Sequence, residues 1–495
     1  MRELVTDLER RVAAEPASVA VLDAAGAHTV ESLLTRAAVL ATALEATTGA
    51  RPTVLVQADN TWRTVVAALA VGRLAGTLAL ISRHASRDEF AAAVEDIRPD
   101  AVVCEPERFG VWQVGAQRPG EVLDGWRMDG QRSGRADRWN GGVVIGLTSG
   151  STGRAKGVVQ TEDALRYAGA RTIEAVGLVP GDAVGALVPL SSAAAFCFGL
   201  YLPLMLGGCI VLSEKWDPAG AVRLLADHDA RWTMCVPTMA LQMAAAAPAD
   251  GLLSAMTAMT VGGGPMDADA LRRAEQRLGT NILRVFGMSE CLGHTTSFPS
   301  DDAERRLATD GRPFPGTDLR AVSEQGVPVP AGVVGRAQVR GPSLFAGYAR
   351  DGAVRPPELT AEGFFPTGDL LVVHPDGAVS IRGREKDIII RGGRNLDVTE
   401  IEAAVARHPQ VDQVCVVPVP DELLGERVAV LVVTDRHDLD LPAIQRHLTA
   451  LGLAKAKWPE FVFRVDALPQ NRVGKLSRGD AARIARELRD AIPTV

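Results

Sequence analysis

Through the first 380 residues, short apolar runs alternate with longer stretches that have a helical pattern rich in Ala, Leu and Arg. The runs lie at residues 53–57, 78–81, 101–104, 143–147, 184–188 and 209–212. Strands that alternate with helices in this way predict layered α/β folding with largely parallel sheets. A chain of 495 residues is also too long for one compact core, so we expect two or more domains.

The pattern changes between Val327 and Val379, where Pro and Gly separate short β-like runs. This change predicts an antiparallel or barrel-like subdomain at about residues 315–382. The last clear break falls at residues 382–387 (RGREKD), and the helix and strand patterns beyond it indicate a small α+β domain. We therefore predict a large N-terminal domain over residues 1–384 and a small C-terminal domain over residues 385–495.

The composition narrows the function classes. Hydrophobic residues make up 47% and charged residues 23% of the chain, as in soluble globular proteins. The net charge of −7 and the lack of a basic run argue against a nucleic-acid partner. The six cysteines are scattered without a Cys-x-x-Cys pair, which is typical of a reducing compartment rather than of disulfides or zinc. The first eleven residues lack the apolar core of an export signal, so we expect a cytoplasmic protein.

One long uncharged stretch tests the expectation of a protein without membrane spans. Residues 183–213 contain no charged side chain and are long enough to cross a bilayer. Pro and Gly interrupt the stretch at several points, which favours a buried strand–helix–strand unit. We therefore expect no integral membrane association.

The strongest functional signal is the segment Leu147–Val159 (LTSGSTGRAKGVV), which follows an apolar run. Its three glycines let the backbone approach a ligand closely and point N–H groups at anionic oxygens. Its four hydroxyls and two cations add donors and compensating charge. The segment lacks the Lys-Ser/Thr step of a Walker loop and the Gly-x-Gly-x-x-Gly of a dinucleotide fold. It therefore predicts a polyphosphate-binding loop of another kind.

Further motifs follow this loop in a fixed order. They are Gly262–Pro265 (GGGP), Phe286–Glu290 (FGMSE), Phe365–Leu370 (FPTGDL), Gly383–Asn395 (GREKDIIIRGGRN) and Pro469–Lys475 (PQNRVGK). Together with the loop, they resemble in order and spacing the adenylate-forming superfamily of acyl-CoA synthetases, peptide-synthetase adenylation domains and luciferases. The resemblance covers most of the chain and implies an ATP- and Mg²⁺-dependent ligase that forms an acyl-AMP intermediate.

The resemblance also implies a nucleotide site. An aromatic face at Phe286 can stack on a purine, the Glu290 carboxylate can hold Mg²⁺, and Asp369 can accept hydrogen bonds from a ribose. Phe286 stands where the family more often has Tyr, which removes one hydrogen bond and keeps the stacking. The implied ATP-binding residues are Thr148, Ser149, Gly150, Ser151, Thr152, Gly153, Lys156, Gly263, Gly264, Pro265, Phe286, Gly287, Met288, Ser289, Asp369, Arg384 and Lys475.

The same resemblance implies that Lys475, Glu290 and Thr148 are the catalytic residues. Lys475 would bridge the substrate carboxylate and the α-phosphate, and Lys386 would be the hinge about which the small domain turns. The loop of Gly392, Gly393 and Arg394 would face the active site in a second, thioester-forming state. Val398 replaces the family's usual Pro after this loop, so we expect a slightly less rigid loop.

The acyl pocket is predicted from the segment after the run at residues 184–188. Many acyl-CoA synthetases have an aromatic-His pair where this chain has Ser191-Ser192, and amino-acid-activating domains have an Asp at the position of Ser192. The lack of that Asp argues against an ordinary α-amino acid. The predicted pocket residues are Ser192, Ala193, Phe196, Met234 and His294, of which His294 is either a contact for a polar substituent or an ordinary core or surface histidine.

The sequence therefore predicts an acid–thiol ligase for an aryl or medium-length aliphatic acid, with CoA as acceptor, acting as a monomer or homodimer. One alternative is an acyl-AMP ligase that loads a carrier-protein phosphopantetheine, or that activates an unusual acid of a biosynthetic pathway. A non-catalytic, nucleotide-binding regulatory protein is an alternative of another class. A pure binder has no need of Lys475, so the presence of Lys475 beside Glu290, Asp369 and Arg384 argues against it.

Overall fold

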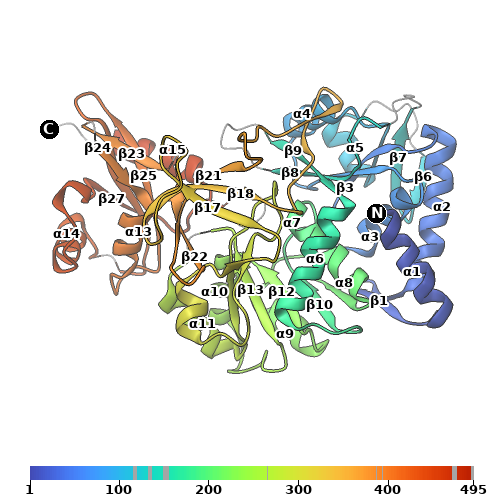
Figure 1. The fold of residues 1–495 in the computed structure, drawn as a ribbon, viewed down its shortest axis with the longest axis horizontal. Helices are drawn as coiled ribbons and strands as arrows, with labels where there is room; N and C mark the ends of the chain where they lie inside the picture. The colour runs from blue at the N-terminus through green and yellow to red at the C-terminus, as the bar shows by residue number, and fades with distance from the viewer. Residues whose placement is uncertain are drawn as a thin grey trace. The chain divides into compact units, whose positions relative to one another are not determined.

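The computed structural model describes residues 1–114, 120–131, 137–148, 155–264, 266–385, 387–392, 394–436, 438–470 and 476–491. The chain forms two compact units, whose helices and strands are drawn in Figure 1. The first unit comprises Met1–Gly263, Ala270–Leu319 and Val339–Phe365. The second comprises Gly264–Asp269, Arg320–Gln338 and Pro366–Val495.

A nine-stranded sheet in the first unit carries the strands that flank the predicted phosphate loop. Its central strands β8, β4, β3 and β5 are parallel, whereas β9 and β7 pair antiparallel at either side of them. The central strands are buried on both faces, which explains their uninterrupted apolar sequences. The strand order is β20 (Ala353–Arg355), β19 (Gly347–Arg350), β9 (Lys156–Thr161), β8 (Gly142–Thr148), β4 (Thr77–Ile81), β3 (Thr53–Gln57), β5 (Ala101–Cys104), β7 (Trp126–Gly130) and β6 (Gly120–Leu123).

The first unit also contains a seven-stranded sheet. All of its pairs are parallel except the hairpin of β1 and β2. The strand order is β14 (Ile282–Val285), β13 (Ala258–Gly262), β12 (Trp232–Cys235), β10 (Ala183–Ala186), β11 (Cys209–Leu212), β1 (Val19–Asp23) and β2 (Gly26–Thr29). Two short strands, β15 (Thr295–Thr296) and β16 (Arg312–Pro313), pair with each other beside it.

One hydrophobic cluster joins the two sheets. It contains buried side chains of β3, β4 and β8 from the first sheet and of β1, β10, β11 and β12 from the second, together with those of α3, α6 and α8. The helices of this unit include α1 (Arg2–Ala14), α2 (Val30–Thr48), α3 (Trp62–Arg73), α4 (Arg87–Ile97), α5 (Pro106–Trp112), α6 (Glu162–Val176), α8 (Leu202–Leu206), α9 (Pro218–Asp227), α10 (Pro237–Ala246), α11 (Ala268–Leu278) and α12 (Ala303–Ala308). Strands that alternate with helices thus form a layered core, as the sequence predicts.

The uncharged stretch at residues 183–213 is a strand–helix–strand unit, which confirms its interpretation. Between β10 and β11 the chain forms α7 (Ala193–Phe196), a five-residue π-helix (Cys197–Tyr201) and α8. Nearly all side chains of the helical part are buried in the cluster between the two sheets. No helix in the described ranges is both long and apolar enough to cross a membrane.

The punctuated β-rich region forms a four-stranded sheet. Its order is β17 (Asp318–Val322), β18 (Val334–Arg340), β21 (Phe365–Val373) and β22 (Val379–Arg384). The strands β21 and β22 pair antiparallel, as predicted for this region, with an irregularity between Leu370 and Leu371.

The second unit also contains a five-stranded sheet covered on both faces. The order is β24 (Arg394–Asp397), β23 (Ile388–Arg391), β26 (Gly425–Val433) and β25 (Gln413–Asp421), and β27 (Phe461–Arg464) also pairs with β26. Alternate residues of β25 and β26 pack against α13 (Val398–Ala406) and α14 (Leu441–Ala450) or against α15 (Arg478–Asp490). A short 3-10 helix (Lys455–Lys457) precedes β27. The α/β class with a large and a small part is therefore confirmed.

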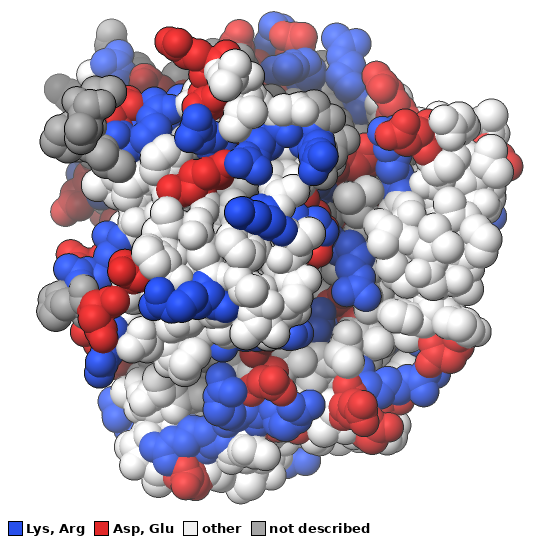
Figure 2. All heavy atoms as spheres, turned by 90° about the vertical axis from the view of Figure 1, so that its left-hand side faces the viewer, with Lys and Arg blue, Asp and Glu red and all other residues white. Residues whose placement is uncertain are grey.

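Charges of both signs are mixed on the surface. On the face shown in Figure 2, Lys and Arg side chains are interspersed with Asp and Glu. Exposed ion pairs of the second unit include Arg483 with Glu487 at 3.0 Å and Arg436 with Asp438 at 3.1 Å. Pairs of this exposed kind contribute little to stability, on the order of 0–1 kcal/mol.

Candidate functional site

The predicted phosphate loop joins two antiparallel strands. Thr148 ends β8, Lys156 begins β9, and the two residues are register partners. Thr148 Oγ1 donates to the carbonyl oxygen of Lys156 over 3.3 Å at the base of the loop. A strand rather than a helix follows the loop, so loop N–H groups, hydroxyls and Lys156 would hold a phosphate without a helix N-terminus. The predicted loop residues Ser149, Gly150, Ser151, Thr152 and Gly153 lie outside the described residues.

Glu290 is held by strand β19 and the residues before it. Tyr348 Oη donates to Glu290 Oε1 over 2.9 Å, and the Phe345 N–H donates to the Glu290 carbonyl oxygen over 2.8 Å. Tyr348 is the register partner of Val158 on β9, and the Lys156 ammonium lies 5.1 Å from the centroid of the Tyr348 ring. The predicted Mg²⁺ ligand and the predicted loop lysine thus meet at one tyrosine side chain.

Tyr348 is a residue that sequence reasoning missed. It lies 58 residues from Glu290, and no motif or spacing in the sequence links the two. The pairing of β19 with β9, the Phe345 hydrogen bond to Glu290 and the bridge between Cys291 and Leu344 bring them together. Burial and the Glu290 carboxylate raise the pKa of Tyr348, so its hydroxyl stays protonated and donates to that carboxylate.

We expect Tyr348→Phe to raise the Mg²⁺ concentration needed for half-maximal acyl-AMP formation. The change removes the hydrogen bond that orients Glu290, an effect of about 1 kcal/mol or roughly fivefold. The measurement is ATP–pyrophosphate exchange at varied Mg²⁺. Tyr167→Phe is the matched control, because Tyr167 also donates from its hydroxyl, to the Pro315 carbonyl oxygen at 2.8 Å. Equal Mg²⁺ dependence of the two variants would contradict the role of Tyr348.

The rest of the Phe286–Glu290 motif is tied to β9 behind the loop. Gln160, a fully buried residue of β9, donates from Nε2 to the Ser289 carbonyl oxygen over 2.7 Å. Met288 and Cys291 exchange backbone hydrogen bonds, which makes the motif a tight turn. A Cβ at Gly287 would lie 3.4 Å from the Gly293 nitrogen, at the tight end of ordinary contact. The strand that leaves the phosphate loop thus supports this motif.

Phe286 and His294 pack against each other. Their rings meet edge to face, with centroids 4.8 Å apart and an angle of 88°. His294 is fully buried, and neither ring nitrogen has a hydrogen-bond partner in the part of the chain that is described. Burial lowers the pKa of His294 to about 3, with the Cys291 backbone acting in the opposite direction. His294 is therefore a neutral core histidine here, and a contact with substrate stays a prediction.

The other predicted acyl-pocket residues lie around α7. Ser192 caps this helix, since its Oγ accepts from the backbone N–H three residues on, at 3.1 Å. Ala193 and Phe196 belong to the buried cluster of the first unit, and Met234 packs against it. A Cβ at Gly146 would lie 2.7 Å from the Ala193 Cβ, so α7 lies directly against β8. The small size of Ala193 thus has a packing reason, and the pocket role of these residues stays a prediction.

In the second unit, Asp369 and Arg384 form the pair predicted to bind ribose. They are register partners on β21 and β22, and Arg384 Nε lies 3.2 Å from Asp369 Oδ1. Asp369 is buried, whereas the Arg384 side chain is 60% exposed. The hairpin therefore brings together two residues that the sequence analysis assigned to one ligand.

The remaining predicted residues are turn residues or lie outside the description. Gly263 has φ +83° after β13, and Gly392 has φ +56° between β23 and β24, where glycine is favoured. Gly264 belongs to the second unit, where Arg394 is exposed at the start of β24. Pro265, Lys386, Gly393 and Lys475 lie outside the described residues. The domain boundary, the hinge and the site roles stay predictions.

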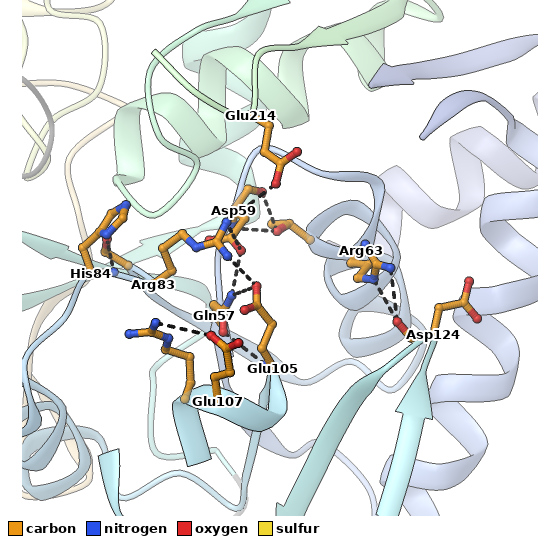
Figure 3. Close-up of polar contacts among 12 residues, drawn as sticks. Gln57, Asp59, Arg63, Arg83, His84, Glu105, Glu107, Asp124 and Glu214 are labelled. Atoms are coloured by element: carbon orange, nitrogen blue, oxygen red, sulfur yellow. Dashed lines mark hydrogen bonds and ion pairs between the residues drawn. The ribbon is translucent and has the colours of Figure 1, made fainter. Parts of the chain in front are cut away.

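A polar cluster that the sequence did not predict lies at the carboxyl ends of β3, β4 and β5 (Figure 3). Arg83 Nη2 lies 2.9 Å from Glu105, and its Nη1 lies 3.6 Å from Asp59 and 3.7 Å from Glu214, which follows β11. Gln57 Nε2 donates to both Asp59 and Glu105 at 2.7 Å. The cluster thus ties the ends of strands from both sheets.

Asp59 is the member of this cluster whose charged form is disfavoured by burial. Burial raises the pKa of Asp59 to about 6, although the Gln57 hydrogen bond and the Arg83 charge lower it. An aspartate whose native pKa is raised takes up protons on folding between its unfolded and native pKa values, so stability falls as pH rises through that window. The charged form of Asp59 therefore destabilises the protein at neutral pH.

We expect Asp59→Asn to stabilise the protein at pH 7.5 and to have little effect at pH 4.5. A pKa shift of this size corresponds to up to about 3 kcal/mol at neutral pH. The measurement is the melting temperature of variant and parent at both values of pH. Glu107→Gln serves as the control, since Glu107 is 81% exposed. A difference in melting temperature that does not depend on pH would show that Asp59 is not the group responsible.

Comparison with known proteins places this arrangement in a family. The AMP-binding enzyme family matches residues 8–349, and the AMP-binding enzyme C-terminal domain family matches residues 400–475. The chain therefore belongs to the AMP-binding enzymes, the adenylate-forming superfamily that its motifs resemble.

Individual relatives differ in the acids they are named for. The chain is 34% identical over 360 residues to a salicylyl-CoA synthase / salicylate adenylyltransferase of a Streptomyces species, covering 71% of this chain and 65% of that protein. It is 30% identical over 346 residues to the medium-chain fatty-acid–CoA ligase of Escherichia coli K12, covering 68% of this chain and 60% of that protein. The chain thus spans less than two thirds of the length of these relatives.

A solved structure matches almost the whole chain. The structure of ATP-bound MatB from Rhodopseudomonas palustris matches with a TM-score of 0.86 and 27% identity, covering 98% of this chain and 99% of that one. The match extends over both units of the chain.

Proposed function

We propose that this protein is an ATP-dependent, AMP-forming acid–thiol ligase that activates an aryl or medium-length aliphatic acid and transfers it to CoA. The observation that carries the proposal is the contact of Glu290 with Tyr348 beside Lys156, next to the phosphate-loop hairpin. A carboxylate and a cation in this position match the two needs of a bound nucleotide, a metal ligand and a partner for phosphate charge. Asp369 and Arg384 would bind the ribose.

The residues present suit Mg²⁺. This ion is commonly bound by one or two carboxylates together with substrate phosphates, and Glu290 offers one carboxylate. Within the described ranges, no group of three or more His, Cys, Asp or Glu could form a metal cage, which fits a metal held mainly by nucleotide phosphates. When bound, Mg²⁺ would neutralise negative charge on those phosphates.

In the first half-reaction, an oxygen of the substrate carboxylate attacks the α-phosphorus of ATP. The bond to the β-phosphate oxygen breaks, and pyrophosphate leaves. The attacking carboxylate is already ionised at neutral pH, so no general base is needed. The barrier arises from repulsion between anions, and Lys475, Lys156 and the loop donors would lower it by positioning and electrostatic stabilisation.

In the second half-reaction, the sulfur of a thiol attacks the acyl carbon as its proton passes to solvent, the bond to the AMP oxygen breaks, and AMP leaves as the thioester forms. Lys475 would stabilise the forming P–O bond only in the first half-reaction, so it can leave the site before the thiol attacks. We propose that rotation at Lys386 withdraws it and turns the loop of Gly392, Gly393 and Arg394 towards the reacting atoms.

The proposed acid is aryl or medium-length aliphatic. Met234 and Phe196 are apolar, and Ser192 provides no carboxylate for an α-ammonium group. One curated relative is named for salicylate and another for medium-chain fatty acids, which supports this range. The relative named for salicylate is named both as a salicylyl-CoA synthase and as a salicylate adenylyltransferase. Loading of a carrier-protein phosphopantetheine is the second candidate.

The test is ATP–pyrophosphate exchange with a panel of acids: benzoate, salicylate, anthranilate, hexanoate, octanoate and phenylalanine. We expect exchange with aryl or aliphatic acids and none with phenylalanine. Thioester formation is then compared on free CoA and on a phosphopantetheinylated carrier protein. Exchange followed by transfer to the carrier alone would favour the second candidate. A lack of exchange with every acid would reject the ligase and favour a non-catalytic nucleotide binder.

A further inference from the structure

Arg478, the first residue of α15, joins three parts of the second unit. Its guanidinium makes a two-pronged contact with Glu402 of α13, at 2.5 and 2.8 Å, and its Nε lies 3.1 Å from Asp387 Oδ2. It also donates to the Val416 carbonyl oxygen on β25 over 3.2 Å. The Glu402 side chain is only 7% exposed and accepts a further hydrogen bond from the Val416 N–H at 2.8 Å. The contact is therefore a largely buried network with defined geometry.

Two residues of this network lie close in the sequence to Lys475 and Lys386, the predicted catalytic lysine and hinge. Arg478 follows Lys475 by three residues, and Asp387 directly follows Lys386. Two backbone contacts fix the base of the segment Pro469–Lys475, which we call the Lys475 segment. Gln470 and Leu476 form a β-bridge, and the Ser477 N–H donates to the Pro469 carbonyl oxygen over 2.8 Å. Leu468 and Leu476 also pack against the apolar cluster of β25, β26 and α15, and Arg478 adds the polar contacts that link this base to Asp387 and Glu402.

We propose that Arg478 is a positioning residue, which through Asp387 and Glu402 makes the base of the Lys475 segment and the chain leaving Lys386 move as one rigid body. The proposal rests on the function proposed above. A rotation at Lys386 would then carry the base of the Lys475 segment with it. Stability alone does not require the network, since buried ion pairs are often no more stabilising than apolar packing.

The test variant is Arg478→Lys. A lysine keeps the positive charge near Glu402, so the fold is retained, but a point charge cannot contact both Glu402 oxygens and Asp387 at once. We expect kcat of ATP–pyrophosphate exchange to fall about 10- to 100-fold, as small misplacements of a catalytic group do, with KM for ATP and acid within about twofold. Thioester formation from supplied acyl-AMP and the melting temperature should stay close to those of the parent.

Arg483→Lys is the matched control, because Arg483 lies on the same helix and pairs with Glu487 and Asp480 at the surface. Asp387→Asn should show a smaller loss of the same kind, and its effect should not add to that of Arg478→Lys. Unchanged exchange in Arg478→Lys, or equal losses in both half-reactions, would overturn the positioning role while the proposed function stands. A parent protein that exchanges with no acid would instead reject the proposed function.

Discussion

Replacement of Lys475 by alanine is expected to slow acyl-AMP formation by roughly 30- to 1,000-fold, which corresponds to about 2–4 kcal/mol of lost transition-state stabilisation. The reason is that both reactants are anions, and a cation that bridges them acts most strongly as the new P–O bond forms. ATP–pyrophosphate exchange measures this half-reaction directly.

The same variant should still make thioester from supplied acyl-AMP at close to the parent rate, because Lys475 would be withdrawn from the reacting atoms in that half-reaction. Lys455→Ala is the control, because Lys455 is another lysine of the small domain and lies outside the Pro469–Lys475 motif. Its ammonium lies 5.9 Å from the centroid of the Trp458 ring. If Lys475→Ala slowed both half-reactions equally, the assignment of two domain orientations would be wrong.

Glu290→Gln should have the second-largest effect, a loss of about 100-fold in kcat/KM together with a higher Mg²⁺ requirement. Glutamine keeps the size of the side chain and an acceptor for the Tyr348 hydroxyl, so local packing is retained. It removes the negative charge that would bind the metal beside the phosphates.

Exchange assays across a range of Mg²⁺ concentrations test whether Glu290 is a metal ligand or an ordinary surface carboxylate. A metal ligand predicts that high Mg²⁺ partly restores the variant, whereas a solvated surface carboxylate predicts no change at any Mg²⁺ concentration. Glu174→Gln, which removes an exposed carboxylate paired with Arg171, serves as the control. An Mg²⁺ profile that matches the parent would remove Glu290 from the site.

Much of the architecture follows from short apolar runs. The runs predicted at residues 53–57, 101–104 and 209–212 are the strands β3, β5 and β11, with the same ends. Nearly all of their side chains are buried, and each strand has at least one parallel neighbour in a sheet covered on both faces, where uninterrupted apolar runs are common. The strand predicted at residues 184–188 extends too far, because β10 ends at Ala186 and the chain then turns towards α7.

The candidate site was predictable to the extent that its residues lie in short motifs. Glu290, Asp369 and Arg384 were singled out from local sequence and resemblance, and the hairpin of β21 and β22 then places the last two side by side. The supporting residues were not predictable in this way. Tyr348 meets Glu290 because the chain before β19 pairs with the turn at Glu290 and Cys291, and the Asp59 cluster forms where strands of two sheets end together.

The division between the two kinds of information has a physical cause. Local sequence carries burial periodicity, glycine conformations and motif chemistry, because each depends on residues close together in the chain, and these suffice for the α/β class and the main site candidates. The partners that hold those candidates depend on long-range pairing. The Tyr348 hydroxyl on Glu290 and the Arg478 guanidinium on Asp387 and Glu402 follow from strand register and helix packing across 58 to 91 residues (478 − 387 = 91). Only the tertiary structure decides such contacts, because many pairs of polar side chains have the right chemistry and few are brought within hydrogen-bonding distance.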